Sequence, residues 1–284
     1  MYQPMGPMIR EAYENGYAVL AVNALNLETA RSIIRAAEAA RSPVIIDFYE
    51  GLLVDHLPAR VLVDGVRALA REASVPVAIS IDHGKHEHLV RQTIHAGFTS
   101  AMMDASELPF EENVEVVRRI VEFAQAYGTS IEGEVGGMGA VAGDAFTREE
   151  MMTDPQQAAE FVRATGVDAL AVSYGSSHGL LPEGFVPVLE FDRLERINEA
   201  CGTPLVLHGG SGTSPEDLQR SVANGVAKIN MGADFMHANA RGFVDAHHED
   251  PDRELFELLA FADAAAQRTV RAYMEPCGSV GRAR

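Results

Sequence analysis

Short apolar runs alternate with amphipathic, helix-like stretches along the whole chain. The runs are rich in Val, Ile, Leu and Ala, which is typical of buried strands. Strands are predicted at 17–23, 43–49, 75–81, 100–104, 130–134, 169–174, 204–208 and 227–230. Helices are predicted between them, at 27–40, 58–71, 87–96, 109–127, 154–165, 191–200 and 214–223, with one or two long helices reaching about 274.

This alternation indicates parallel strands, because parallel neighbours need helical crossovers that cover both faces of the sheet. Eight such units match a closed (β/α)8 TIM barrel, which typically takes roughly 250 residues. An open doubly wound sheet is the alternative, but no G-x-G-x-x-G follows the first strand. We therefore predict one α/β domain over residues 1–284, a TIM barrel with a C-terminal helical extension.

Polar side chains fall at the carboxyl ends of the predicted strands, where barrels of this kind carry their active sites. The strands are otherwise almost wholly apolar, so structural needs alone do not explain the polar residues. The strand ends carry Asn23, Asp47, Asp82, His83, Asp104, Glu134, His178, His208 and Asn230. We expect these residues to meet on one rim and to form an active site.

Three of these residues are histidines from three different strands: His83, His178 and His208. Three imidazoles with one open position are a catalytic zinc arrangement. A single histidine at a strand end would more often serve as a hydrogen-bonding loop residue, but three at equivalent positions favour the metal. His86 and His88 are expected on the first turn of an exposed helix, outside the site.

Carboxylates next to these histidines suggest proton transfer and metal support. Asp82 directly precedes His83 and is the candidate for proton transfer to or from a substrate hydroxyl. Asp104 and Glu134 are candidates for a second metal site or for acceptors that orient the histidines. The alternative for both is capping of loop amides.

A glycine-rich segment, GGSG at 209–212, runs from the seventh strand into a helix capped by Ser214. Free backbone amides and a helix N-terminus can bind an anion. Tight loops between strands and helices also use glycine, so glycine content alone is weak evidence for an anion site. The evidence is stronger here because the segment directly follows His208.

The formal net charge of −18 excludes the basic surfaces that nucleic acids and anionic membranes require. No apolar run approaches the roughly 18 residues of a membrane span, and no export signal is evident at the N-terminus. Cys201 and Cys277 form no C-x-x-C motif, which favours reduced thiols in the cytoplasm. An anionic substrate would need local donors or a metal to overcome the negative field.

The chain resembles the metal-dependent class II aldolases, specifically the fructose- and tagatose-bisphosphate aldolase family. The resemblance extends in order over nearly the whole chain. The matching segments are IDHG at 81–84, MDASELPFEEN at 103–113, EGEVG at 132–136, TGVDALAV at 165–172, SHG at 177–179, LHGGSG at 207–212, KIN at 228–230 and CGS at 277–279.

The resemblance implies a zinc ion held by His83, His178 and His208, with Asp82 as the acid/base. The zinc would polarise a ketone and stabilise the enediolate left by carbon–carbon cleavage. Asp104 and Glu134 match alternative metal ligands or supporting carboxylates. Residues implied to bind substrate are Asn23, Gly179, Gly209, Gly210, Ser211 and Asn230. Zn²⁺ is the expected cofactor, with an additional monovalent cation left open, and the expected assembly is a homodimer or homotetramer.

Several substrate-contacting positions depart from the family pattern. The mobile loop usually reads G-G-x-E-D, but Ala142 and Gly143 stand where its acids belong. No lysine follows His178, Ala233 replaces a threonine, and the second strand ends in DFY at 47–49 instead of Q-x-S. Each lost charge-assisted hydrogen bond is worth about 1.5 to 3 kcal/mol, so a tightly bound bisphosphate is disfavoured.

The leading hypothesis is a zinc-dependent aldolase acting on a ketose or ketose-phosphate with altered phosphate recognition. One alternative is an ordinary fructose- or tagatose-bisphosphate aldolase. A second keeps the metal and Asp82 but performs epimerisation or isomerisation of a sugar. A third is a sugar- or metal-sensing barrel without turnover, which has little use for Asp82 beside a metal.

Overall fold

The computed structural model describes residues 1–136, 152–176 and 188–283. Its eight strands form a closed barrel in sequence order, with every neighbouring pair parallel. The predicted TIM barrel is therefore confirmed, and the open sheet is wrong. The strands are β1 Val19–Asn23, β2 Val44–Tyr49, β3 Val77–Gly84, β4 Ser100–Met103, β5 Ser130–Val135, β6 Ala169–Val172, β7 Leu205–Leu207 and β8 Val226–Met231.

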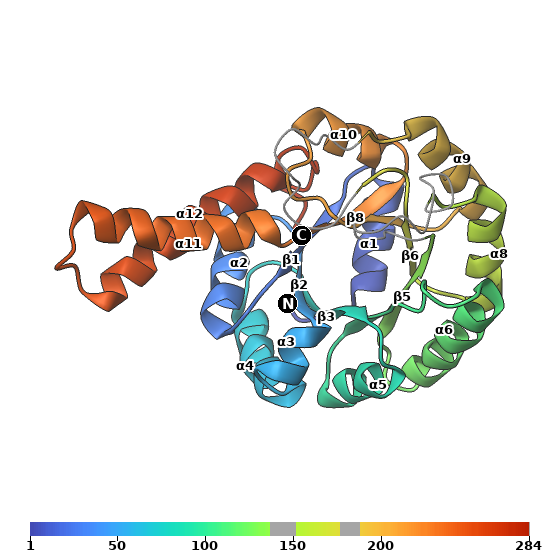
Figure 1. Cartoon of the computed structure of the whole chain (residues 1–284), viewed down its shortest axis with the longest axis horizontal. Coiled ribbons are helices and arrows are strands. Elements are labelled where there is room, and N and C mark those ends of the chain that lie inside the picture. The colour runs from blue at the N-terminus through green and yellow to red at the C-terminus, as the bar shows by residue number, and fades with distance from the viewer. Residues whose placement is uncertain (137–151, 177–187, 284) are drawn as a thin grey trace, which may run out of the picture.

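Helices surround the barrel and cover the outer faces of the strands (Figure 1). Most lie where the alternation predicts them, within a residue or two at each end. The helices are α1 Met5–Glu14, α2 Leu27–Ala40, α3 Glu50–Asp55, α4 Ala59–Glu72, α5 Glu87–Ala96, α6 Phe110–Gln125, α8 Pro155–Thr165, α9 Phe191–Cys201, α10 Pro215–Ala223, α11 Ala233–Glu249 and α12 Leu255–Met274.

Two helices were not predicted from the sequence, the short α3 and the N-terminal α1. Helix α1 packs against β1, β3, β5 and β8 and closes the amino-terminal end of the barrel. Its buried Met5, Met8, Ile9 and Ala12 follow helical spacing and join the small residues inside the barrel. The amino-terminal end of the barrel interior is thus filled largely by apolar side chains.

Helices α11 and α12 form an antiparallel hairpin that projects away from the barrel (Figure 1). The later part of α12 returns to the body of the protein, where α12 packs against α2 and β1. None of the described helices is both long enough and apolar enough to cross a membrane.

Candidate active site and metal centre

The carboxyl ends of β3 and β7 bring three predicted site residues together. Asp82, His83 and His208 each offer a ligand atom, and the three atoms lie within 4.8 Å of one another. His83, Asp104 and Glu134 form a second such group. The structure thus joins five of the predicted residues in two overlapping clusters around His83.

A distortion of β3 gives Asp82 and His83 their shared orientation. Neighbours in a regular strand point to opposite faces of the sheet. Here the register with β4 shifts between Ile81 and Gly84, and His83 adopts a left-handed φ of 48°. Such a conformation is uncommon outside glycine and is concentrated at functional sites. It allows two consecutive side chains to serve the same cluster.

Gly84 permits this distortion because the adjacent backbone leaves no room for a side chain. A Cβ at this position would lie 2.6 Å from the carbonyl oxygen of Met102 on β4. The glycine of the IDHG segment is therefore explained by close strand packing directly after the candidate ligand.

Each of the two histidines has a carboxylate on one ring nitrogen and faces Asp82 with the other. His208 Nε2 lies 2.7 Å from Glu132 Oε1, and its Nδ1 lies 3.7 Å from Asp82 Oδ1. His83 Nδ1 lies 2.8 Å from Asp104 Oδ2, and its Nε2 lies 4.0 Å from Asp82 Oδ1. A carboxylate acceptor fixes the tautomer and directs the other nitrogen's lone pair at the metal position.

Two asparagine side chains hold the Asp82 carboxylate. Asn23 Nδ2 donates to Asp82 Oδ2 at 2.7 Å, and Asn230 Nδ2 donates to Asp82 Oδ1 at 3.1 Å. Gly232 leaves room for Asn23, because a Cβ there would lie 2.6 Å from its Oδ1. Both asparagines were predicted to bind substrate, and the structure gives them a contact with the candidate acid/base.

The electrostatic surroundings keep Asp82 ionised. Burial alone would raise its pKa, but the charges of His83, His208 and Lys228 outweigh burial. The hydrogen bond from Asn23 acts in the same direction, so the pKa of Asp82 lies below its ordinary value. An ionised carboxylate can accept a proton, as a general base must.

The two histidines differ in pKa. Burial, followed by the charge of His83, lowers the pKa of His208, which favours the neutral imidazole that a metal needs. Burial also opposes protonation of His83, but the hydrogen bond to Asp104 and the charges of Asp82 and Glu134 raise its pKa to about 9. In the metal-free protein, His83 therefore carries a proton at neutral pH.

Asp104 contacts a histidine and also accepts a hydrogen bond from a loop amide, as two of the three roles considered for it require. Its Oδ2 binds His83, while its Oδ1 accepts hydrogen bonds from the backbone amide and hydroxyl of Ser106. Burial would raise its pKa, but these hydrogen bonds hold the pKa well below the ordinary value. Glu134 Oε2 lies 3.8 Å from His83 Nδ1.

A buried ionic network beneath the histidines was not recognised from the sequence. Lys228 Nζ lies 2.7 Å from Glu132 Oε2 and 3.6 Å from Asp47 Oδ2. Asn230 Nδ2 donates to Asp47 Oδ2 at 2.9 Å, which connects the network to Asp82. A signal was available: Glu132 and Lys228 each stand two residues before a predicted site residue, on the same face of their strands.

The charge balance of this region fits a bound cation. Lys228 is the one buried lysine or arginine among the described residues, yet it shares the interior with several buried carboxyl groups. Burial raises the pKa of Asp47 to about 7 even with Lys228 nearby. Buried charge is costly unless it is paired, so a divalent metal would relieve the excess. The carboxyl groups are Asp47, Asp82, Asp104, Glu132 and Glu134.

The glycine-rich segment after β7 adopts two left-handed turns, with φ of 67° at Gly209 and 76° at Gly212. The amide of Gly210 donates to the carbonyl oxygen of Asn230 at 2.9 Å. The amide of Gly212 donates to Asp234 Oδ2 at 3.0 Å, and the amide of Asp234 donates to Ser211 Oγ at 3.2 Å. Part of the predicted anion cradle is thus engaged within the protein.

Three predicted features lie outside the described residues. They are the third histidine, His178, its neighbour Gly179, and the loop segment at 139–144 with Ala142. The rest of the predicted site is described.

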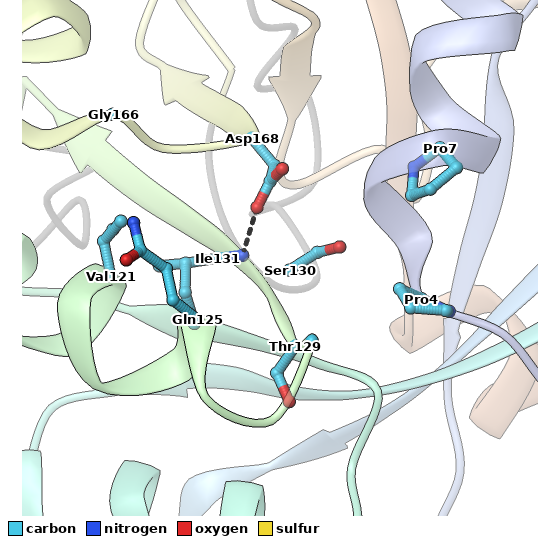
Figure 2. A pocket seen from close by; sticks show the side chains of 10 residues that line it. Pro4, Pro7, Val121, Gln125, Thr129, Ser130, Ile131, Gly166 and Asp168 are labelled. Carbon is cyan, nitrogen blue, oxygen red and sulfur yellow. Dashed lines mark hydrogen bonds between the residues drawn. The ribbon is translucent and has the colours of Figure 1, made fainter.

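A cavity of about 270 Å³ lies away from these residues, at the amino-terminal edge of the barrel (Figure 2). It is lined in part by Pro4, which directly precedes α1, by Pro7 in the first turn of α1, and by Ser130 at the start of β5. Asp168 accepts a hydrogen bond from the amide of Ile131 there at 2.8 Å. Active sites of barrels lie at the opposite, carboxyl end.

The fold and the site define a (β/α)8 barrel enzyme with a candidate metal centre at the carboxyl ends of its strands. The family model described as "Fructose-bisphosphate aldolase class-II" matches residues 3–282. The chain belongs to this family of metal-dependent aldolases, which are lyases, and the predicted resemblance is confirmed.

Curated relatives and solved structures agree with this assignment. The "Probable fructose-bisphosphate aldolase" of Bacillus subtilis is 39% identical over 282 residues, covering 98% of each chain. The "Fructose-bisphosphate aldolase" of Staphylococcus epidermidis is 37% identical over 283 residues, covering 99% of this chain and 98% of that protein. The crystal structure of the YdjI aldolase from Escherichia coli K12 has a TM-score of 0.88 at 32% identity, covering 100% of both chains.

Proposed function

We propose that this protein is a zinc-dependent aldolase that reversibly cleaves a carbon–carbon bond in a ketose or ketose-phosphate. One observation carries the proposal: His83 and His208, each backed by a carboxylate, point their second ring nitrogens at the same oxygen of Asp82. This arrangement places two metal ligands beside a general base, as metal-assisted cleavage of an aldol requires.

The zinc ligands in this proposal are His83, His208 and the predicted third histidine, His178. Three imidazoles leave one position open for substrate, which distinguishes a catalytic zinc site from a structural one. A bound zinc ion supplies Lewis-acid polarisation of the substrate ketone. Glu132 and Asp104 hold the two described imidazoles in the orientation that a metal needs.

Asp82 performs proton transfer in this mechanism. It removes the proton from the hydroxyl group on the aldehyde-side carbon of the scissile bond. That carbon becomes an aldehyde, the bond breaks, and its electron pair passes to the ketone-side fragment. A proton added to that fragment completes the reaction. Asn23 and Asn230 keep the carboxylate in place throughout.

The substrate's ketone side is assigned to Gly209, Gly210 and Ser211 after β7, together with Asn230, Asn23 and the predicted Gly179. Asp234 places a carboxylate on the amide of Gly212, and Ala233 offers no hydroxyl in the same region. These features weaken binding of a fully charged phosphate. They support a substrate with altered phosphorylation, although the relatives are named as fructose-bisphosphate aldolases.

The substrate assignment is tested with purified, zinc-loaded protein and a panel of fructose and tagatose. Each sugar is supplied as its 1,6-bisphosphate, as its 1-phosphate, as its 6-phosphate and in free form. We expect a higher kcat/KM for a singly phosphorylated or free ketose than for either bisphosphate. Efficient turnover of both bisphosphates would contradict the altered substrate. NMR of the products separates cleavage from epimerisation, because only cleavage yields two carbonyl fragments.

Zinc binding is expected to weaken at acidic pH. Zinc must displace the proton that His83 holds with a pKa of about 9 in the metal-free protein. Zinc affinity should therefore fall about tenfold per pH unit between pH 8 and pH 6. Calorimetry in buffers of different ionisation enthalpy should count about one proton released per zinc.

Asp104→Asn provides the control for this pH dependence. It replaces the carboxylate whose hydrogen bond contributes most to raising the pKa of His83, so the steep part of the profile should move to lower pH. A zinc affinity that is constant from pH 8 to pH 6 in the parent protein would contradict the prediction.

We also propose that the chain assembles as a homodimer or homotetramer. The start of α12 lies at the end of the projecting hairpin (Figure 1). It exposes Leu255, Phe256 and Leu259, with Phe256 72% exposed. Contiguous apolar side chains of this size on a surface typically mark an interface. A second copy of the chain is the occupant that the family resemblance favours.

Phe256→Glu is expected to lower the molar mass measured by sedimentation velocity to that of a smaller species. The substitution places a charge within the exposed apolar cluster, where burial would be costly. Val61→Glu on α4 changes an apolar residue of 51% exposure away from the hairpin and should leave the mass unchanged. Equal masses for all three proteins would place the interface elsewhere.

We also propose that residues 1–284 form a single domain and that the protein is located in the cytoplasm. The continuous barrel with its α11–α12 extension supports the single domain. The free thiols of Cys201 and Cys277 support a reducing compartment.

A further inference from the structure

The loop after β3 carries an exposed cation at the mouth of the site. Lys85 follows the candidate ligand His83 by two residues, and its side chain is 46% exposed. The chain has only two lysines, and the other, Lys228, is buried beneath the site. Among the described residues of the loops that follow the strands, Lys85 is the only lysine or arginine.

The backbone of this loop is held in place by a buried carboxylate. Glu50, at the start of α3, accepts hydrogen bonds from the amides of Lys85 at 2.6 Å and His86 at 3.1 Å. Its other oxygen lies 2.5 Å from His86 Nδ1. Glu50 is only 7% exposed, so the clamp is built into the structure. It fixes the point from which the Lys85 side chain extends.

The ammonium group is available to a ligand. It pairs with Glu107 at 2.5 Å, but that carboxylate is 78% exposed. Exposed pairs of this kind contribute little net free energy, so an anionic ligand can compete with Glu107. The pKa of Lys85 is raised first by this hydrogen bond, and the charges of Asp104 and Tyr49 add to the effect. Glu107 lies in the loop that follows β4, so the pair places the ammonium group at the carboxyl rim of the barrel, between the loops after β3 and β4.

The position of Lys85 indicates which end of a substrate would reach it. The barrel closes in sequence order, so β3 lies across from β7. The proposed ketone-side contacts, Gly209 to Ser211, follow β7, whereas Asp82 and Lys85 belong to β3 and its loop. A substrate that extends from β7 across the metal would place its aldehyde-side fragment near Lys85.

We propose that Lys85 determines specificity by binding an anionic group, a carboxylate or a phosphate, at the far end of the substrate's aldehyde-side fragment. The assignment rests on the proposed aldolase function. In a strongly acidic protein, this cation gives an anionic substrate a local partner. A lysine ammonium binds either anion as a point charge, so both sources share one chemistry.

The test measures aldol addition of dihydroxyacetone phosphate, or of free dihydroxyacetone, to three aldehydes by the zinc-loaded protein. Propanal is neutral, succinic semialdehyde carries a carboxylate, and glyceraldehyde 3-phosphate carries a phosphate. Lys85→Met should lower kcat/KM for at least one charged aldehyde by about ten- to hundredfold, the range expected for one charge-assisted hydrogen bond. Propanal should be unaffected, and Lys85→Arg should restore most of the loss.

Arg119→Met serves as the matched control, because it removes an equally exposed, carboxylate-paired cation from the outer helix α6. It should change none of the three rates. An equal effect of Lys85→Met on all three aldehydes, or on none, would overturn the inference. Loss with one charged aldehyde only would identify the anion as carboxylate or phosphate.

A binding measurement keeps the inference separate from the proposed function. If the parent protein adds neither dihydroxyacetone phosphate nor free dihydroxyacetone to any of the aldehydes, the proposed aldolase function fails. Calorimetry with inorganic phosphate and with succinate then compares the parent protein with Lys85→Met. Binding of either anion that weakens about tenfold or more in the variant supports the anion site, and equal binding overturns it.

Discussion

His208→Ala is expected to lower zinc affinity at least 100-fold and to abolish measurable aldol cleavage. The imidazole is 1% exposed and is oriented by Glu132, and alanine offers no ligand atom in its place. Losing even a residue that only orients a ligand typically costs 10- to 100-fold in metal affinity, and losing the ligand itself should cost more. Zinc content after mild purification and turnover by a coupled assay measure both effects.

His88→Ala is the matched control, because His88 is an exposed histidine at the start of α5, the helix that follows β3. It should retain the zinc content and activity of the parent protein. Equal zinc in His208→Ala and the parent protein would contradict the proposed ligand set. We expect this variant to fold, because Glu132 keeps its ion pair with Lys228, and circular dichroism checks this expectation.

Asp82→Asn is expected to lower kcat by about 10²- to 10⁴-fold while zinc remains bound. General acid–base groups contribute rate factors of this size. The amide keeps the shape of the side chain but removes the ionised carboxylate that accepts the proton. His83 and His208 keep their own carboxylate partners, Asp104 and Glu132, so the metal should remain. Zinc analysis and turnover on the same sample separate the two effects.

Asp64→Asn on α4 provides the control, because its exposed carboxylate has no contact with the site. It should behave like the parent protein. A turnover of Asp82→Asn within tenfold of the parent value would show that another group transfers the proton. Loss of zinc together with activity would instead assign Asp82 to metal binding.

The barrel could be predicted from the sequence because its strands are buried on both faces. Such strands form continuous apolar runs, and their alternation with helices leaves few possible folds. Helix α1 was missed although Met5, Met8, Ile9 and Ala12 follow helical spacing. The six-residue α3 directly follows β2 and is too short for a periodic signal.

Convergence of Asp82, His83 and His208 could also be predicted, because the carboxyl ends of barrel strands meet at one rim. The bulge in β3 could not be predicted from the sequence, because regular alternation would place Asp82 and His83 on opposite faces. The contacts of Lys228 with Glu132 and Asp47 join β8 to β5 and β2 across the barrel interior. Such contacts depend on strand tilt and stagger, which local sequence patterns do not reveal.

The residues of the candidate metal centre and those that depart from the family pattern have different proposed roles. Cleavage of the carbon–carbon bond is assigned in the proposal to Asp82, the two oriented imidazoles and the buried carboxylates. In the proposed function, substrate selection is assigned to Lys85, Asp234 and the residues around Gly212. A change of substrate can therefore occur around an unchanged chemical centre.

In the proposed mechanism, proton transfer by Asp82 requires a metal bound by His83 and His208. Adding zinc stepwise to the metal-free protein tests this requirement most directly. Aldol cleavage of the best ketose in the panel is followed after each addition, at pH 8. Activity should be absent in the chelated protein, rise in proportion to added zinc, and reach its maximum at one zinc per chain. Full turnover by the chelated protein, or turnover that does not depend on added zinc, would contradict the proposed mechanism.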